Sequence, residues 1–152
     1  MEIFPQRLGH KTPTWVRAGA LFHVRIRAQR LQTPVLTEPC LAALLLRAAQ
    51  RYQELGHWQC ELFLLMPDHL HALLRFPSDP GVAKVVGSWK QGTARFQHVQ
   101  WQENFFDHRI RSHQEVLQKW HYIRMNPVVK GLCREPAEWP HWWRGTTSSE
   151  AR

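Results

Sequence analysis

The chain has 152 residues, of which 43% are hydrophobic, and this predicts one folded domain and excludes a disordered chain. Its net charge of +8 favours an anionic partner, nucleic acid above all, although a generally basic surface is the alternative. The longest apolar run, 41–46, is too short to span a bilayer, so no membrane segment is expected.

The basic residues lie in two blocks of the sequence, which folding of the chain could bring together. Six Lys/Arg stand against one acidic residue in 1–37, and nine stand against three in 81–134. The three cysteines, Cys40, Cys60 and Cys133, are widely spaced and odd in number, which favours a reduced compartment with cysteines as small apolar fillers. Because the N-terminus also lacks an apolar segment, we expect a cytoplasmic protein.

The first predicted element is a half-buried strand. Residues 1–14 are polar and contain two prolines, so a loose arm is expected there. Residues 21–28 then alternate with a period of two. One face carries Phe22, Val24 and Ile26, and the other carries His23, Arg25 and Arg27. The second face is predicted to be basic and exposed.

A helix and a hairpin follow. Thr37 is a plausible N-cap with Pro39 in the first turn, and Gly56 can end this helix. Residues 58–66 and 69–76 are predicted to form two antiparallel strands that turn at Pro67-Asp68. In the second strand, four residues are expected to face a core: Leu70, Ala72, Leu74 and Phe76. His69, His71 and Arg75 share the opposite face, with Leu73 among them.

The C-terminal half predicts a helix, a strand and another helix. Residues 80–97 form a helix whose inner stripe comprises Val82, Val85, Val86, Trp89, Thr93 and Phe96. A fourth strand is expected over 101–110. A third helix is expected over 113–126, with Val116, Trp120 and Ile123 on its inner face.

The order strand, helix, strand, strand, helix, strand, helix predicts an α+β fold. It indicates a ferredoxin-like (RRM-like) antiparallel sheet with helices on one face and an additional helix after it. The other sheet face is then expected to hold His69 and His71 open to a ligand. We divide the chain into an N-terminal arm (1–14), a domain (15–135) and a C-terminal tail (136–152). The rigid, aromatic part of this tail, 136–143, could dock over the third helix or contact nucleic acid. The terminal tryptophans, Trp15, Trp139, Trp142 and Trp143, could stack on unpaired bases or pack against the domain.

Four residues form the candidate site. His69 and His71 are two residues apart on a strand, so they point to the same face and make half of a metal site. Tyr122 and Asn126 are spaced to share a helix face. Each has a plainer alternative: the histidines could be an ordinary surface pair, Tyr122 a packing residue, and Asn126 an N-cap before Pro127. Asp68 could support the histidines or simply serve the turn.

Several segments together carry a family resemblance. The stretch 66–71, Met-Pro-Asp-His-Leu-His, resembles the HUH motif of single-tyrosine transposases, and the stretch 122–132, which contains Tyr-x-x-x-Asn-Pro, resembles their tyrosine helix. More narrowly, the chain looks like the REP-associated tyrosine transposases, named for repetitive extragenic palindromes. Residues 89–91 and 105–111 also look typical of that group, and the resemblance covers about residues 12–135.

The resemblance implies a metal-dependent endonuclease and strand transferase that acts in DNA transposition on single-stranded, often hairpin, DNA. Tyr122 would be the catalytic nucleophile, and it would stay joined to the 5′ end of the cleaved strand. His69, His71 and Asn126 would hold a divalent metal, Mg²⁺ or Mn²⁺. Relatives of this kind act as monomers or homodimers.

Basic residues on several elements are candidates for contacts to DNA phosphates, which supply affinity rather than sequence choice. They are Arg17, Arg25, Arg27, Lys84, Lys90, Arg95, Arg109 and Arg111. Two other functions compete with transposition. One is a hairpin-binding protein with the same fold and little or no cleavage activity. The other is a phosphodiester hydrolase that uses metal-bound water in place of Tyr122.

Overall fold

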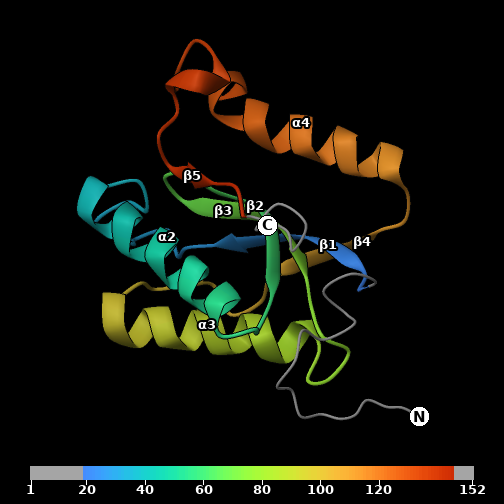
Figure 1. Cartoon of the computed structure of the whole chain (residues 1–152). Helices are drawn as coiled ribbons and strands as arrows, with labels where there is room; N and C mark the ends of the chain where they lie inside the picture. Colours follow the sequence, from blue (N-terminus) through green and yellow to red (C-terminus); the bar gives the residue numbers. More distant parts are fainter. Residues whose placement is uncertain (1–18, 146–152) are drawn as a thin grey trace.

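A computed structural model describes residues 19–145 of the chain. Its strands and helices follow the predicted order, with a short 3-10 turn and a small strand added at the end (Figure 1). They are β1 (Leu21–Arg27), α2 (Pro39–Glu54), β2 (Gln59–Leu65), β3 (His69–Arg75), α3 (Val82–Gln97), β4 (Phe106–Ile110), α4 (His113–Val129), η1 (Pro136–Glu138) and β5 (Trp142–Trp143).

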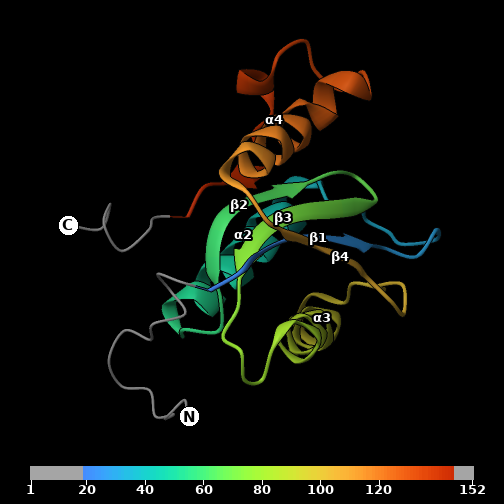
Figure 2. The ribbon, with the colours of Figure 1, turned by 90° about the vertical axis from the view of Figure 1, so that its right-hand side faces the viewer.

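The strands form one antiparallel sheet in the order β4-β1-β3-β2-β5. Helices α2 and α3 cover one face of this sheet and α4 lies across the other, as Figures 1 and 2 show from two sides. The first four strands in this order have the ferredoxin-like arrangement, so the predicted α+β fold class is confirmed. Pairing of β1 with β3 sets Arg25 opposite His71 and Arg27 opposite His69.

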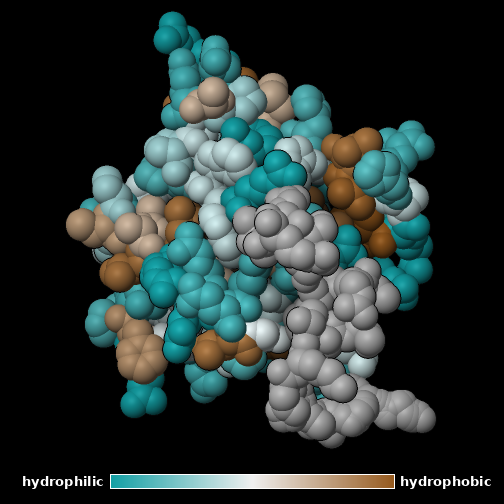
Figure 3. Space-filling model, viewed as in Figure 1, coloured by the Kyte–Doolittle hydropathy of each residue, from teal (hydrophilic) through white to brown (hydrophobic). Residues whose placement is uncertain are grey.

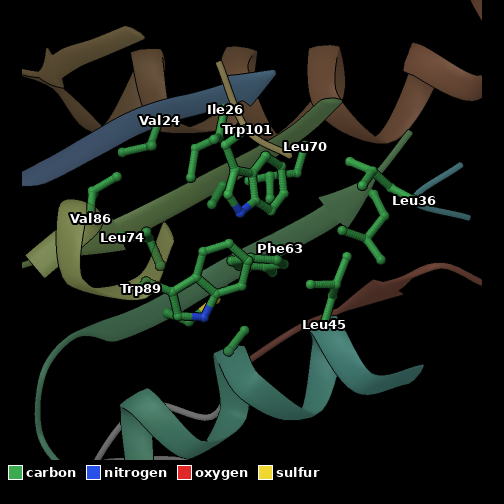
Figure 4. Packing of buried hydrophobic residues seen from close by; sticks show 14 of the residues in the cluster. Val24, Ile26, Leu36, Leu45, Phe63, Leu70, Leu74, Val86, Trp89 and Trp101 are labelled. Carbon is green, nitrogen blue, oxygen red and sulfur yellow. The ribbon is translucent and has the colours of Figure 1, made fainter. Parts of the chain in front are cut away.

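The main hydrophobic core lies between the sheet and the helices α2 and α3 (Figure 4). Strand β3 contributes its four predicted core residues, Leu70, Ala72, Leu74 and Phe76. The buried indole rings of Trp58, Trp89 and Trp101 join them. The alternation of apolar residues along β1 and β3 thus determines which sheet face receives α2 and α3.

A second apolar cluster lies on the other face of the sheet, beneath α4. It consists of Leu21, Leu62, Leu64, Met66, Leu73, Ile110, Ile123 and Trp139. The expectation that this face is open to a ligand is therefore wrong for most of its area. Strand β2 is apolar on both faces, so α4 and the segment after it must cover its second face to remove those leucines from water.

Several predicted details of the elements are also wrong. Helix α2 is capped by Glu38, whose Oε1 accepts a hydrogen bond of 2.9 Å from the Leu41 amide, and not by Thr37. Phe96 lies outside the buried stripe of α3, with 70% of its surface exposed. Strand β4 starts only at Phe106. Trp101 makes just an isolated bridge to the chain after β1, because its indole turns inward to donate to Thr93 Oγ1.

Helix α4 runs three residues beyond its predicted end. It continues through Pro127 to Val129, so Asn126 lies inside the helix and the N-cap alternative for this residue is wrong. Ser112 caps the helix at its start by accepting from the Glu115 amide. The inner face holds Ile123, fully buried, as predicted.

The described part of the aromatic tail packs back onto the domain. Trp139 donates from Nε1 to the carbonyl of Leu65 at 2.9 Å, and β5 pairs with β2. The Arg124 guanidinium lies over the ring of Trp142 at 3.8 Å from its centroid. Docking over α4, the third predicted helix, is one of the two roles considered for this tail, and it is confirmed for these residues. The arm (1–14) and Trp15 lie outside the described residues.

The cysteines differ in their exposure to solvent. Cys60 is a buried filler as predicted, whereas Cys40 is exposed at the start of α2. Within residues 19–145 no helix combines the length and apolar character needed to cross a membrane. On the side seen in Figure 3, most of the surface is hydrophilic and the hydrophobic residues form separate patches.

Candidate active site

The fold brings three of the four predicted site residues into one buried cluster and sets the fourth at its rim. His69 and His71 project from β3 on the same side, with ring centroids 4.9 Å apart. Asn126 reaches down from α4, and its Nδ2 donates to Nε2 of His71 at 3.2 Å. Tyr122, one turn earlier on α4, has its ring centroid 5.8 Å from that of His71.

These residues differ sharply in exposure. His71 is 2% exposed, and His69 and Asn126 are each 7% exposed, whereas Tyr122 is 53% exposed. The half-exposed phenol ring therefore lies against a cluster that is itself almost fully buried.

A third histidine, which the sequence analysis assigned to an exposed face, belongs to the cluster. His23 is 3% exposed, and its Nε2 lies 3.0 Å from Nδ1 of His71 in a hydrogen bond. The two rings are stacked, with centroids 5.1 Å apart. The period of β1 did place His23 on the face of Arg25 and Arg27, but only the β1–β3 pairing shows that this face meets the histidines of β3.

Burial keeps the three imidazoles neutral near pH 7. It is the largest cause that lowers the pKa of His23 from 6.5 to about 4, with Lys119 and Arg25 adding to it. It likewise lowers the pKa of His71 from 6.5 to about 2, followed by the effects of His69 and His23. The pKa of His69 is lowered by burial too, although Asp68 opposes this shift. Neutral imidazole is the form that binds metal ions.

Asp68 supports His69 directly. Its Oδ1 lies 2.7 Å from Nδ1 of His69, and this hydrogen bond is the main cause that lowers the pKa of the Asp68 carboxyl. A carboxylate on one ring nitrogen orients the imidazole and leaves Nε2 with the lone pair for a metal ion. Asp68 thus does more than form the turn.

The residues present fit a divalent metal ion. Asn126 Oδ1 is buried and has no hydrogen-bond partner among the described residues, which is unusual for a buried amide oxygen. No group of three or more His, Cys, Asp or Glu side chains within 19–145 has the arrangement of a metal site. The candidate set is instead two imidazole nitrogens and one amide oxygen, and mixed nitrogen and oxygen donors suit Mn²⁺, whereas Mg²⁺ prefers oxygen alone.

Positive charge lies close to the cluster. Arg25 and Arg27 pair across the strands with His71 and His69, on the α4 side of the sheet. The guanidinium of Arg25 lies over the ring of Phe106, 4.9 Å from its centroid. Lys119 Nζ is 6.0 Å from the centroid of the Tyr122 ring.

The other candidate phosphate contacts lie elsewhere. Lys84, Lys90 and Arg95 belong to α3, on the opposite face of the sheet. Lys90 Nζ is held by the carbonyl oxygens of residues 102, 103 and 104 at 2.8–3.3 Å. Arg109 pairs with Phe22 and so shares the α3 face, Arg111 follows β4, and Arg17 lies outside the described residues.

A separate groove of about 520 Å³ lies between α2 and α3. Arg51, Tyr52, Arg95 and Phe96 are among its lining residues. Because these helices cover the face opposite α4, the groove is not part of the histidine cluster.

Known proteins bear out the resemblance seen in the sequence. No protein-family model matches the chain. The chain is 25% identical over 133 residues to the REP-associated tyrosine transposase of Escherichia coli (strain K12), an alignment that covers 83% of this chain and 76% of that protein. Its fold matches a solved structure of a REP-associated tyrosine transposase bound to a REP hairpin, with a TM-score of 0.70 and 17% identity, over 92% of this chain and 82% of that one. In sequence and in fold, the chain resembles the REP-associated tyrosine transposases.

Proposed function

We propose that the chain is a metal-dependent endonuclease and strand transferase that acts on single-stranded, hairpin-forming DNA in transposition. The proposal rests on the half-exposed phenol of Tyr122, which lies at the edge of a buried cluster of neutral imidazoles. Asn126 Oδ1, in the same cluster, has no hydrogen-bond partner among the described residues. The proposal is supported by the likeness to a REP-associated tyrosine transposase in sequence and, in fold, to one bound to a REP hairpin.

In the proposed reaction Tyr122 is the nucleophile. Its hydroxyl oxygen attacks the phosphorus of a DNA phosphodiester, a P–Oη bond forms and the P–O3′ bond breaks. The phenol proton leaves, and the departing 3′ oxygen gains a proton to become a free 3′-OH. The DNA stays joined by its 5′ phosphate to Tyr122, so the energy of the phosphodiester bond is kept and rejoining needs no ATP.

His69, His71 and Asn126 would hold the metal ion, Mg²⁺ or Mn²⁺. When bound, such an ion neutralises phosphate charge and polarises the phosphorus toward attack. Arg25 and Arg27 would contact phosphates beside the cluster. The Lys119 ammonium, 6.0 Å from the centroid of the Tyr122 ring, would add positive charge beside the phosphate under attack. DNA as the substrate makes the cytoplasm the proposed location, with the protein acting as a monomer or a homodimer.

Covalent capture tests this function. Labelled hairpin DNA with single-stranded flanks is incubated with the protein and Mn²⁺ or Mg²⁺ and then separated on a denaturing gel. We expect an adduct that survives denaturation and disappears in Tyr122→Phe, while that variant still binds the hairpin. His69→Ala should lose metal-dependent cleavage. The matched control is Tyr52→Phe, because Tyr52, on α2 far from the cluster, is the other tyrosine of the chain.

The outcomes separate the three functions. Cleavage that persists in Tyr122→Phe would indicate a hydrolase that uses water. Hairpin binding by the wild-type protein without adduct or cleavage would indicate a binding protein. Full activity of His69→Ala would reject the metal site.

A further inference from the structure

His23 touches His71 but is not among the proposed metal ligands. It is as deeply buried as His71, and its Nε2 lies 3.0 Å from Nδ1 of that residue. We infer that His23 is a positioning residue, which accepts a hydrogen bond from Nδ1–H of His71 and so keeps the lone pair of His71 on Nε2, where a metal ion binds. This inference rests on the proposed function.

The direction of the hydrogen bonds supports this role. Asn126 Nδ2 can only donate, so Nε2 of His71 accepts the bond of 3.2 Å between them. A neutral imidazole has one bare nitrogen and one N–H, and the proton of His71 must then be on Nδ1. That N–H points to Nε2 of His23, which accepts. The proton of His23 is consequently on its Nδ1, which is buried and has no partner within the described residues.

The same tautomer of His71 serves metal binding, because an ion would take the place of the Asn126 N–H as the partner of Nε2. The tautomer of a ligating histidine is set by the hydrogen bond of its other ring nitrogen, and here His23 provides it for His71 as Asp68 does for His69. The acceptors differ in charge, since Asp68 is a carboxylate and His23 a neutral ring. Stacking of the two rings, 28° from parallel, also limits the orientation of the His71 ring.

Two variants separate the acceptor from the bulk of the side chain. His23→Leu fills the site but accepts no hydrogen bond. His23→Gln places an amide oxygen near the position of Nε2 and keeps an acceptor. The matched control is His108→Gln, because His108 pairs with His23 across the strands but hydrogen-bonds Glu115 and not His71.

Two measurements on these proteins test the inference. Imidazole ¹H–¹⁵N correlation spectra of the metal-free protein near pH 7 should show His71 with its proton on Nδ1. In His23→Leu that N–H loses its acceptor while Nε2 still accepts from Asn126, so the Nδ1 proton should shift upfield and exchange faster with water. Titration with Mn²⁺ should show about 10- to 100-fold weaker binding by His23→Leu, the usual loss when such a hydrogen bond is removed. His23→Gln should recover most of the affinity, and His108→Gln should match the wild type.

Failure of this inference can be told from failure of the proposed function. The inference is overturned if wild-type His71 carries its proton on Nε2, or if His23→Leu binds Mn²⁺ as tightly as the wild type. The wild-type spectrum decides this even if His23→Leu does not fold. Failure of the proposed function instead appears in the wild-type protein, as no adduct with hairpin DNA under any metal condition.

Discussion

Two buried polar atoms at the site have no hydrogen-bond partner among the described residues, His23 Nδ1 and Asn126 Oδ1. Leaving such a group unpaired costs about 1–3 kcal/mol of folding stability, so two of them in contact with one buried residue call for an explanation. Both atoms belong to side chains that hydrogen-bond to His71, the least exposed of the site residues. The cluster is therefore assembled at the expense of stability, as expected for residues that bind a ligand.

The buried histidines predict acid sensitivity. The folded-state pKa values of about 4 for His23 and about 2 for His71 lie below the 6.5 of the unfolded chain. Below pH 6.5 the unfolded state therefore binds more protons than the native state, and the stability present above this pH is lost as the pH falls. Between pH 7.5 and 5.5 the free energy of unfolding of the metal-free protein should drop by about 2–3 kcal/mol.

Urea unfolding at the two pH values measures this drop. His71→Gln removes one of the groups and should reduce the drop by about 1 kcal/mol. His57→Gln, at an exposed histidine, should leave it unchanged. Equal stability of the wild-type protein at both pH values would contradict the neutral state of the cluster.

At the scale of elements, the placement of α4 decides whether a site exists. Tyr122 and Asn126 reach the histidines because the apolar residues beneath the helix hold it against β2 and β3. The hydrogen bond from Trp139 to the Leu65 carbonyl and the stacking of Arg124 on Trp142 fasten the chain that follows the helix. The aromatic tail thus supports α4 from its C-terminal side.

Ile123 is the side chain of α4 that is most deeply buried in this contact, at 0% exposure. Ile123→Ala should lower the free energy of unfolding by about 2–4 kcal/mol, through lost burial and the cavity left behind. Leu117→Ala, on the same helix with 57% of its surface exposed, should change it by about 0.5 kcal/mol or less. Chemical denaturation of the two variants compares them, and equal losses would mean that α4 is not held by this cluster.

At the scale of the whole molecule, charge and fold together determine where the proposed DNA substrate would lie. The net charge of +8 favours anionic partners over the protein surface in general. Arg25 and Arg27, however, are the two candidate phosphate contacts that the sheet sets directly beside the histidines. The candidates on α3 lie on the opposite face. The affinity for a substrate bound at the cluster should therefore depend more on the two arginines of β1 than on the basic residues of α3.

Salt dependence of hairpin binding tests this distribution. A plot of log affinity against log salt concentration has a negative slope, and each phosphate contact that is removed makes this slope less steep by about 1. Arg27→Gln should show this decrease together with weaker binding. Arg47→Gln should not, because Arg47 lies on α2 and pairs with Glu54 at 3.1 Å. Identical slopes for both variants would place the DNA away from β1.

The sequence by itself determined the features that depend on local periodicity. A strand period of two set His69 and His71 on one face, and helical spacing set Tyr122 and Asn126 on another. The order of elements also predicted the sheet. These features follow from backbone geometry over a few residues, so they can be derived before any contact is known.

The tertiary structure alone decided the rest. His23 joins the site through the register of β1 with β3, across 48 positions of sequence. The burial of the site and the second apolar cluster depend on where α4 and the tail pack. The continuation of α4 through Pro127 overrode the local signal for a helix boundary. Strand register and helix docking result from the simultaneous burial of apolar surfaces far apart in the chain, which no local pattern contains.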